Sequence, residues 1–89
     1  MKQKILGRPF NIRKVKELDG DTVGEVHYRD QEILLVETSA DCMDRTCWHE
    51  IVHIFDEFMR IKDDCNKLSE NEVARLSYAI STHLREIKR

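Results

Sequence analysis

The hydrophobic and polar positions divide the chain into a first part with strand-like patterns and a second part with helical periodicity. Residues 5–12 predict a strand, and Pro9 favours an edge position because proline has no backbone N–H to donate to a neighbouring strand. Residues 18–21, with Asp-Gly at their centre, predict a turn. Residues 23–28 and 32–37 then predict two strands joined as a hairpin.

The second strand of this hairpin is apolar at four successive positions, residues 33–36. A strand with one wet face alternates apolar and polar residues, so an unbroken apolar run predicts burial on both faces. From Ser39 or Asp41, either of which can cap a helix, the period changes to a helical one that continues to about Ile61.

The first helix has an apolar face and a polar stripe. At 100° per residue the broad apolar face consists of Trp48, Ile51, Val52, Phe55, Phe58 and Met59. The polar stripe on the opposite side consists of Arg45, His49, His53, Asp56 and Glu57. This pattern is typical of a helix that packs on a core and turns one unusual row of polar groups away from it.

A polar loop, residues 62–68, precedes a second helix that begins with the Ser-x-x-Glu capping box of residues 69–72 and runs to near the C-terminus. Its expected buried stripe is Val73, Leu76, Ile80, Leu84 and Ile87. Together these elements predict an α+β fold, a small and mainly antiparallel sheet of three or four strands beside two main helices, in a single domain over residues 1–89.

Length and composition narrow the classes of function. A domain of 89 residues buries only part of its surface and is marginal on hydrophobic burial alone, so a bound metal would help to stabilise it. The net charge of -2 gives no reason to expect a nucleic-acid partner. Residues 1–7 do not resemble a signal peptide, and the apolar run 33–36 is too short to span a membrane, so we expect a cytoplasmic protein without a membrane partner.

The three cysteines, Cys42, Cys47 and Cys65, lack the Cys-x-x-Cys spacing of a structural zinc site. Their odd number and the missing signal favour reduced thiols. Cys47 lies on the apolar side of the first helix, where packing is its expected role.

The segment His49-Glu50-Ile51-Val52-His53 is the candidate for chemistry. Residues four apart on a helix lie one above the other, so His49 and His53 can approach one cation from the same side. Zinc accepts such nitrogen ligands and leaves a position for water. Glu50 can reach that water as a general base. The residues therefore predict a zinc site with Glu50 as the catalytic group.

A carboxylate from the second helix is expected to complete the ligand set. Glu72 is favoured over Glu70, because it lies one turn before Leu76 and its stem borders the expected buried stripe. The competing interpretation of Glu72 is the capping box, in which it bonds back to the backbone near Ser69.

Residues 48–53, followed by residues 72–77, resemble the ImmA/IrrE-type metallopeptidases, relatives of the glutamate-zincins, and especially their short phage and prophage versions. The resemblance covers most of residues 23–84 and implies a small sheet before the active-site helix. By motif position it implies zinc held by His49, His53 and Glu72, with Glu50 catalytic. It also implies a peptidase that acts on a protein or peptide, with a role in phage or prophage regulation and a possible regulatory partner.

Several polar residues have two interpretations each. Asp56 could orient a ligating imidazole or be a solvated carboxylate. Tyr78 and His83 are candidates for polarising a substrate carbonyl, although Tyr78 is more often simply half-buried. His27 is expected to be an exposed strand residue. Residues 32–36 or the neighbouring strand could pair with an extended peptide.

Two alternatives to catalysis use the same residues. In the first, zinc staples a small protein-binding module, and a fourth protein ligand such as Cys65 replaces the water. In the second, the chain binds no metal and its histidines are solvated. The sequence leaves the substrate, the cleavage site and the oligomeric state open.

Overall fold

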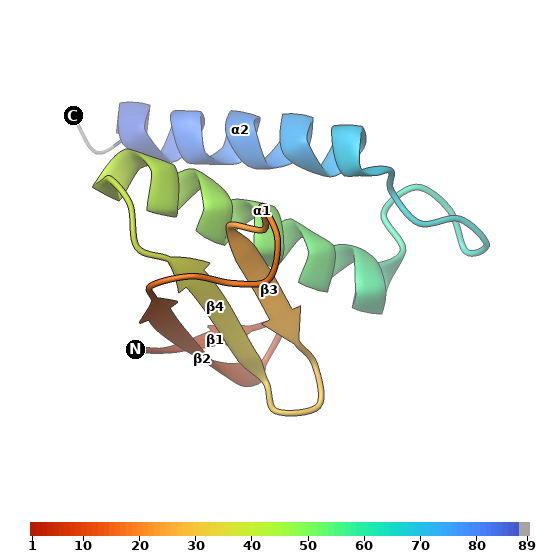
Figure 1. Ribbon diagram of the computed structural model, residues 1–89. Coiled ribbons are helices and arrows are strands. Elements are labelled where there is room, and N and C mark those ends of the chain that lie inside the picture. The colour runs from red at the N-terminus through yellow and green to blue at the C-terminus, as the bar shows by residue number, and fades with distance from the viewer. Residues whose placement is uncertain (88–89) are drawn as a thin grey trace.

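The computed structural model describes residues 1–87, so the last two positions of the domain predicted over residues 1–89 lie outside the described residues. The elements are β1 (Lys2–Ile5), β2 (Arg8–Val15), β3 (Gly24–His27), β4 (Glu32–Val36), α1 (Ala40–Met59) and α2 (Glu70–Ile87) (Figure 1). The predicted α+β class is confirmed. Within the described part of the chain, neither helix combines the length and the apolar character needed to cross a bilayer.

The four strands form one sheet in the order β1-β2-β4-β3. The two outer pairs are antiparallel, whereas β2 and β4 are parallel. The predicted hairpin is confirmed, with Gly24 opposite Leu35 and His27 opposite Glu32. Within residues 1–87, β3 pairs with β4 alone, so no strand lies along its other edge.

The strand predicted over residues 5–12 is in fact a hairpin. Leu6 and Gly7, with φ of 51° and 77°, form a two-residue turn between β1 and β2, and glycine takes such a φ without strain. Pro9 lies in β2, an interior strand, so its expected edge position is wrong. Pairing of β2 with β4 begins only at Asn11. Pro9 precedes this paired stretch, so the N–H that proline lacks is not needed for a hydrogen bond to β4.

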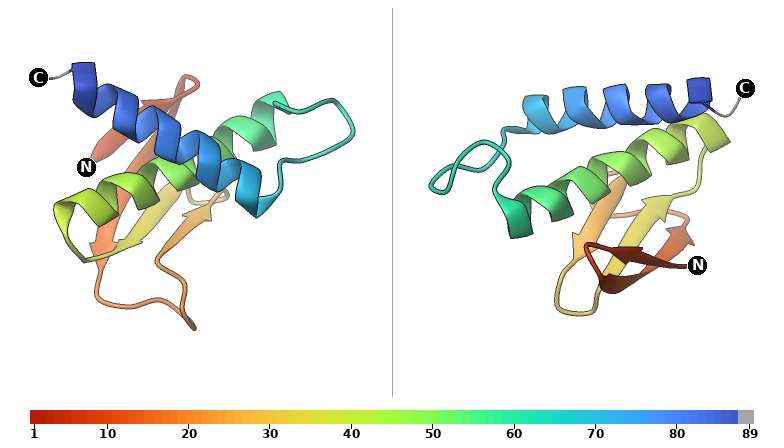
Figure 2. Two further views of the ribbon diagram at one scale, coloured as in Figure 1. Left: turned by 90° about the horizontal axis from the view of Figure 1, so that it is seen from above. Right: turned by 180° about the vertical axis from the view of Figure 1, so that it is seen from behind.

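The molecule has three layers, with α1 between the sheet and α2 (Figures 1 and 2). Alternate residues of the strands face α1, because side chains along a strand point to opposite faces in turn. The buried cluster consists of Ile5, Phe10, Ile33, Leu35, Ile51 and Ile54. Of the apolar run 33–36, residues 33–35 are buried as predicted, whereas Val36 is only partly buried.

The expected apolar face of α1 ends before the helix does. Phe58 and Met59, in its last turn, are exposed. The Phe58 ring lies under the Arg8 guanidinium, 4.1 Å from the ring centroid, and edge-on to Tyr28. Side chains at the surface, rather than the core, therefore cover this end of the helix. Cys47 does pack against the core, and burial is the main cause that raises the pKa of its thiol to about 11.

The stripe of α2 that faces α1 differs from the one expected. Its buried residues are Val73, Ser77 and Ser81. Leu76 and Ile87 are exposed instead. Small side chains allow α2 to lie close to α1, and both serine hydroxyls donate to carbonyls three residues earlier, so their burial leaves no unpaired donor.

Candidate metal centre

The two histidines of the predicted motif lie side by side on α1. The helix begins at its N-cap Ser39, whose hydroxyl accepts a hydrogen bond from the backbone N–H of Cys42. Further along the helix, its repeat brings His49 and His53 onto one side, with ring centroids 4.9 Å apart. Each side chain is about a quarter exposed, 28% for His49 and 27% for His53. Both rings can therefore meet a ligand from the solvent side.

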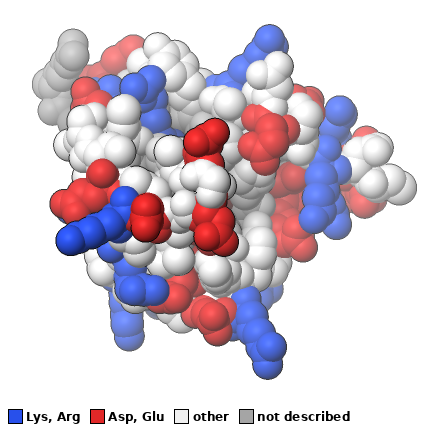
Figure 3. Space-filling model, in the orientation of Figure 1, with Lys and Arg blue, Asp and Glu red and all other residues white. Residues whose placement is uncertain are grey.

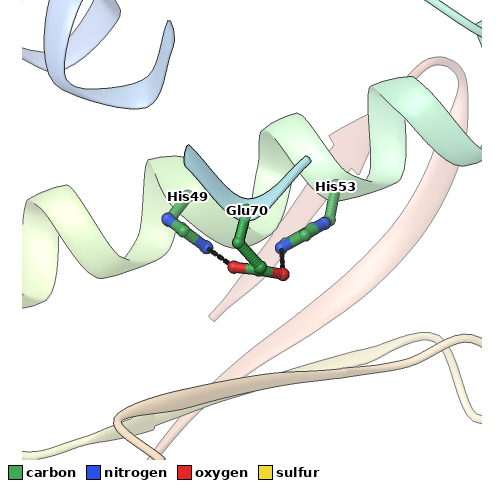
Figure 4. Close-up of side chains that lie close together, drawn as sticks. All are labelled: His49, His53 and Glu70. Atoms are coloured by element: carbon green, nitrogen blue, oxygen red, sulfur yellow. Dashed lines mark hydrogen bonds and ion pairs between the residues drawn. The ribbon is translucent and has the colours of Figure 1, made fainter. Parts of the chain in front are cut away.

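Glu70, in the first turn of α2, lies between the two imidazoles (Figure 4). Its Oε2 is 3.0 Å from His49 Nε2 and its Oε1 is 3.0 Å from His53 Nε2. One ligand atom from each of the three residues lies within 4.8 Å of the other two. Two imidazole nitrogens and a carboxylate oxygen thus converge from two different helices on one point.

Glu72, the preferred third ligand in the sequence-based prediction, does not join this group. Its Oε1 accepts a hydrogen bond from Ser69 N at 2.9 Å, and Ser69 Oγ accepts one from Glu72 N at 3.1 Å. These bonds form the reciprocal capping box, and the backbone bond to Ser69 is the main cause that lowers the pKa of Glu72.

The helical repeat explains why only one of the two glutamates faces α1. Residues two apart on a helix point in nearly opposite directions, about 200° apart. The buried stripe of α2 contains Val73 and Ser77, and Glu70 precedes them by one and two turns. The prediction of Glu72 assumed that Leu76 was buried, and that assumption placed the wrong glutamate on the inner side.

Asp56 has a role that neither sequence interpretation anticipated. It is only 3% exposed, its Oδ1 accepts from Ile61 N at 3.3 Å, and its Oδ2 accepts from Leu68 N at 2.9 Å. It therefore neither orients an imidazole nor is solvated. By joining both ends of the segment between the helices, Asp56 sets where α2 begins and so where Glu70 lies.

We expect Asp56→Ala to lower the free energy of unfolding by roughly 3 kcal/mol, because it leaves two partly buried backbone N–H groups without their charged acceptor. Urea unfolding of the metal-free protein measures this loss. Asp63→Ala is the matched control, since Asp63 accepts backbone bonds within the same segment but is fully exposed. Equal effects of the two substitutions would contradict the assigned role of Asp56.

Glu50 is buried beside the histidine group. It is 7% exposed, and its Oε2 has no hydrogen-bond partner within residues 1–87. Strand β3 covers it closely, since a Cβ at Gly24 would lie 3.3 Å from Glu50 Cγ and 2.7 Å from Thr46 Cγ2. Burial is the largest cause that raises the pKa of Glu50 to about 7; His49 acts in the opposite direction.

This pKa predicts a pH-dependent stability of the metal-free protein. A carboxyl whose pKa rises on folding stabilises the fold while it is protonated, and that contribution is lost as pH rises from about 4.5 through about 7. Compared with Glu50→Gln, which carries no titrating group there, we expect the wild type to lose about 3 kcal/mol between pH 4 and pH 8. Urea unfolding of both proteins across this range measures the difference, and a constant difference would contradict it.

The residues fit a zinc ion. Burial is the main cause that lowers the pKa of His53, which favours the neutral imidazole that a metal requires. Zinc takes nitrogen and carboxylate ligands at about 2 Å, so tetrahedral ligands lie about 3.3 Å from one another. The three ligand atoms lie within 4.8 Å of one another, so they must move somewhat closer around an ion, and Glu70 is an exposed side chain at the start of its helix.

An open cleft of about 680 Å³ lies over this group. Its lining includes Val23 and Gly24 at β3, Arg45 and Thr46 on α1, and Tyr78 on α2. In Figure 3 several acidic side chains lie among uncharged residues in the middle of the face, and Lys and Arg lie mainly toward its periphery. A cation can therefore reach His49 and His53 through this cleft, which Glu50 also lines.

Among Tyr78, His83, His27 and Cys65, which the sequence also singles out, only Tyr78 lines this cleft. Tyr78 lines it and is exposed, whereas His83 is not part of the lining. His27 is exposed on β3 and pairs with Glu25 at 2.8 Å. Cys65 is an exposed thiol outside the ligand group. Sequence reasoning missed the covering role of Gly24; an isolated glycine at the start of a strand pattern was the available signal.

Comparison with known proteins adds no assignment. No protein-family model matches the chain, and no curated protein or solved structure is significantly similar to it. The resemblance to the ImmA/IrrE-type metallopeptidases therefore stays a prediction, and a functional assignment depends on the geometry of the site.

Proposed function

We propose that this chain is a zinc-dependent peptidase in which His49, His53 and Glu70 hold the metal and Glu50 is the general base. The observation that carries the proposal is the buried carboxyl of Glu50, whose Oε2 has no partner within residues 1–87 and which lines the same cleft as the converging ligand group. A buried carboxylate without a partner is costly for folding, and such groups concentrate at sites that use them.

The roles of the side chains follow from their positions. A bound zinc ion supplies a Lewis acid that polarises the scissile carbonyl and makes water easier to deprotonate. Glu50 takes the proton of the attacking water on its carboxylate and passes it to the nitrogen of the leaving amine. The low exposure of Glu50 keeps competing water away from it.

The substrate of the proposed reaction is a protein or peptide. β3 offers a free edge beside the cleft, and an extended peptide can pair with such an edge through its backbone. The resemblance to short phage and prophage members of the ImmA/IrrE type supports a role in phage or prophage regulation.

Cleavage by purified protein tests the proposal. We expect the full chain to bind zinc at an equimolar ratio and to cleave an unfolded protein such as reduced casein. A chelator should abolish cleavage, and added zinc should restore it. The absence of zinc in the purified protein, together with no thermal shift on adding zinc, would contradict the proposal.

A second candidate is a protein-binding module that zinc staples without catalysis. It is supported by the origin of the ligands, because two come from α1 and one from α2, so a metal would join the two helices. The two functions differ in their dependence on Glu50, which a staple does not need. Zinc binding that stabilises the fold, without any metal-dependent cleavage, would favour the staple.

A further inference from the structure

Arg45 is a charged residue of the cleft for which zinc chemistry has no use. It precedes His49 by one helical turn, so Arg45, His49 and His53 form one row along α1. Arg45 is exposed and lines the same cleft as the two histidines and Glu50. Among the described residues that line this cleft, Arg45 alone carries a permanent positive charge.

The nearby carboxylates of α1 are engaged elsewhere. Asp41 and Asp44 lie 3.8 and 3.5 Å from the guanidinium of Arg85, which reaches across from α2. Within residues 1–87, Arg45 forms no ion pair with any of the carboxylates. An arginine that lines a cleft and forms no ion pair within the protein is available to an anion from outside.

The charge balance of the loaded site favours such an anion. A divalent ion together with Arg45 outweighs the carboxylates of Glu50 and Glu70, so the residues that line the cleft would carry a net positive charge with metal bound. Thr22, Thr38 and Thr46 add hydroxyl groups to the same lining. Hydroxyl and guanidinium donors together match the oxygens of a carboxylate.

We propose that Arg45 is a specificity-determining residue that binds a carboxylate of the substrate about two residues from the cleaved bond. This inference rests on the proposed peptidase function. Four residues along a helix advance about 6 Å, and an extended peptide covers that distance in about two residues. The carboxylate can belong to an acidic side chain or to the end of the chain, since both present the same group.

Short peptides that carry a hydroxamate test this inference without requiring turnover. The hydroxamate binds the zinc and so fixes which peptide residue lies near Arg45. It is placed at the carboxyl end of the peptide in one series and at the amino end in another. Within each series, peptides with glutamate are compared with peptides that carry glutamine at the same place, which is the first or the second residue from the hydroxamate. In the second series, a free terminal carboxylate is also compared with its amide. Affinities for the zinc-loaded full chain are measured by calorimetry.

At least one carboxylate peptide should bind about tenfold more tightly than its amide counterpart. Arg45→Gln should remove this preference, and Arg45→Lys should retain part of it. Arg75→Gln, which removes the same charge from an exposed position on α2 outside the cleft lining, should leave it unchanged. Which peptide binds most tightly also shows whether Arg45 prefers a side-chain carboxylate or a terminal one.

Two failures have different meanings. If hydroxamates bind but no pair differs, or if the preference persists in Arg45→Gln, the role of Arg45 is wrong and the peptidase proposal is unaffected. If no hydroxamate binds to protein saturated with zinc, the open metal site itself is wrong, and the inference about Arg45 falls with it.

Discussion

Glu50→Gln is expected to lower kcat/KM for peptide cleavage by a factor of about 10² to 10⁴ while zinc remains bound, because it removes the general base. Glutamine has nearly the same size and shape, so the cover formed by β3 at Gly24 need not change. It cannot accept a proton from water at neutral pH. The metal ligands His49, His53 and Glu70 are untouched, and their hold on zinc should remain.

Rates of cleavage and the zinc content of the same samples measure this prediction. Glu57→Gln is the matched control, because it lies on the same helix but pairs with Lys67 at 2.8 Å and is not part of the cleft lining. That variant should cleave at the wild-type rate. Cleavage by Glu50→Gln at more than a tenth of the wild-type rate would exclude Glu50 as the base.

Glu70→Gln should weaken zinc binding by more than about a hundredfold, whereas Glu72→Gln should leave it unchanged. Loss of groups that merely orient zinc ligands already costs about 10- to 100-fold in affinity, and a direct anionic ligand contributes more. Glu70 faces both imidazoles, whereas the partners of Glu72 within residues 1–87 are Ser69 and Lys62. Glutamine can replace glutamate in a capping box, so the control variant should fold normally.

Competition with a chromogenic zinc chelator at constant pH measures both affinities. The comparison is informative because the two substitutions make the same chemical change two residues apart on one helix. An equal loss of affinity in both variants would indicate general damage to the start of α2. A loss confined to Glu72→Gln would mean that Glu72 is the ligand after all.

The sequence by itself determined the features that depend on local periodicity. His49 and His53 are four residues apart, and any helix through them brings their rings to one side, as observed. The buried run of residues 33–35, the hairpin of β3 and β4 and the α+β class follow from similarly local patterns. The capping box at Ser69 and Glu72 was also visible as a motif.

Only the tertiary structure decided which glutamate meets the histidines and what Asp56 does. The choice between Glu70 and Glu72 depends on which side of α2 faces α1. Two of the buried residues on that side are serines, so a pattern of apolar residues does not identify it. Asp56 bonds to backbone groups five and twelve residues away, a relation that no local repeat encodes. Spacing along one helix sets angles within that helix, but contacts between helices depend on packing that minimises voids and leaves few polar groups unpaired.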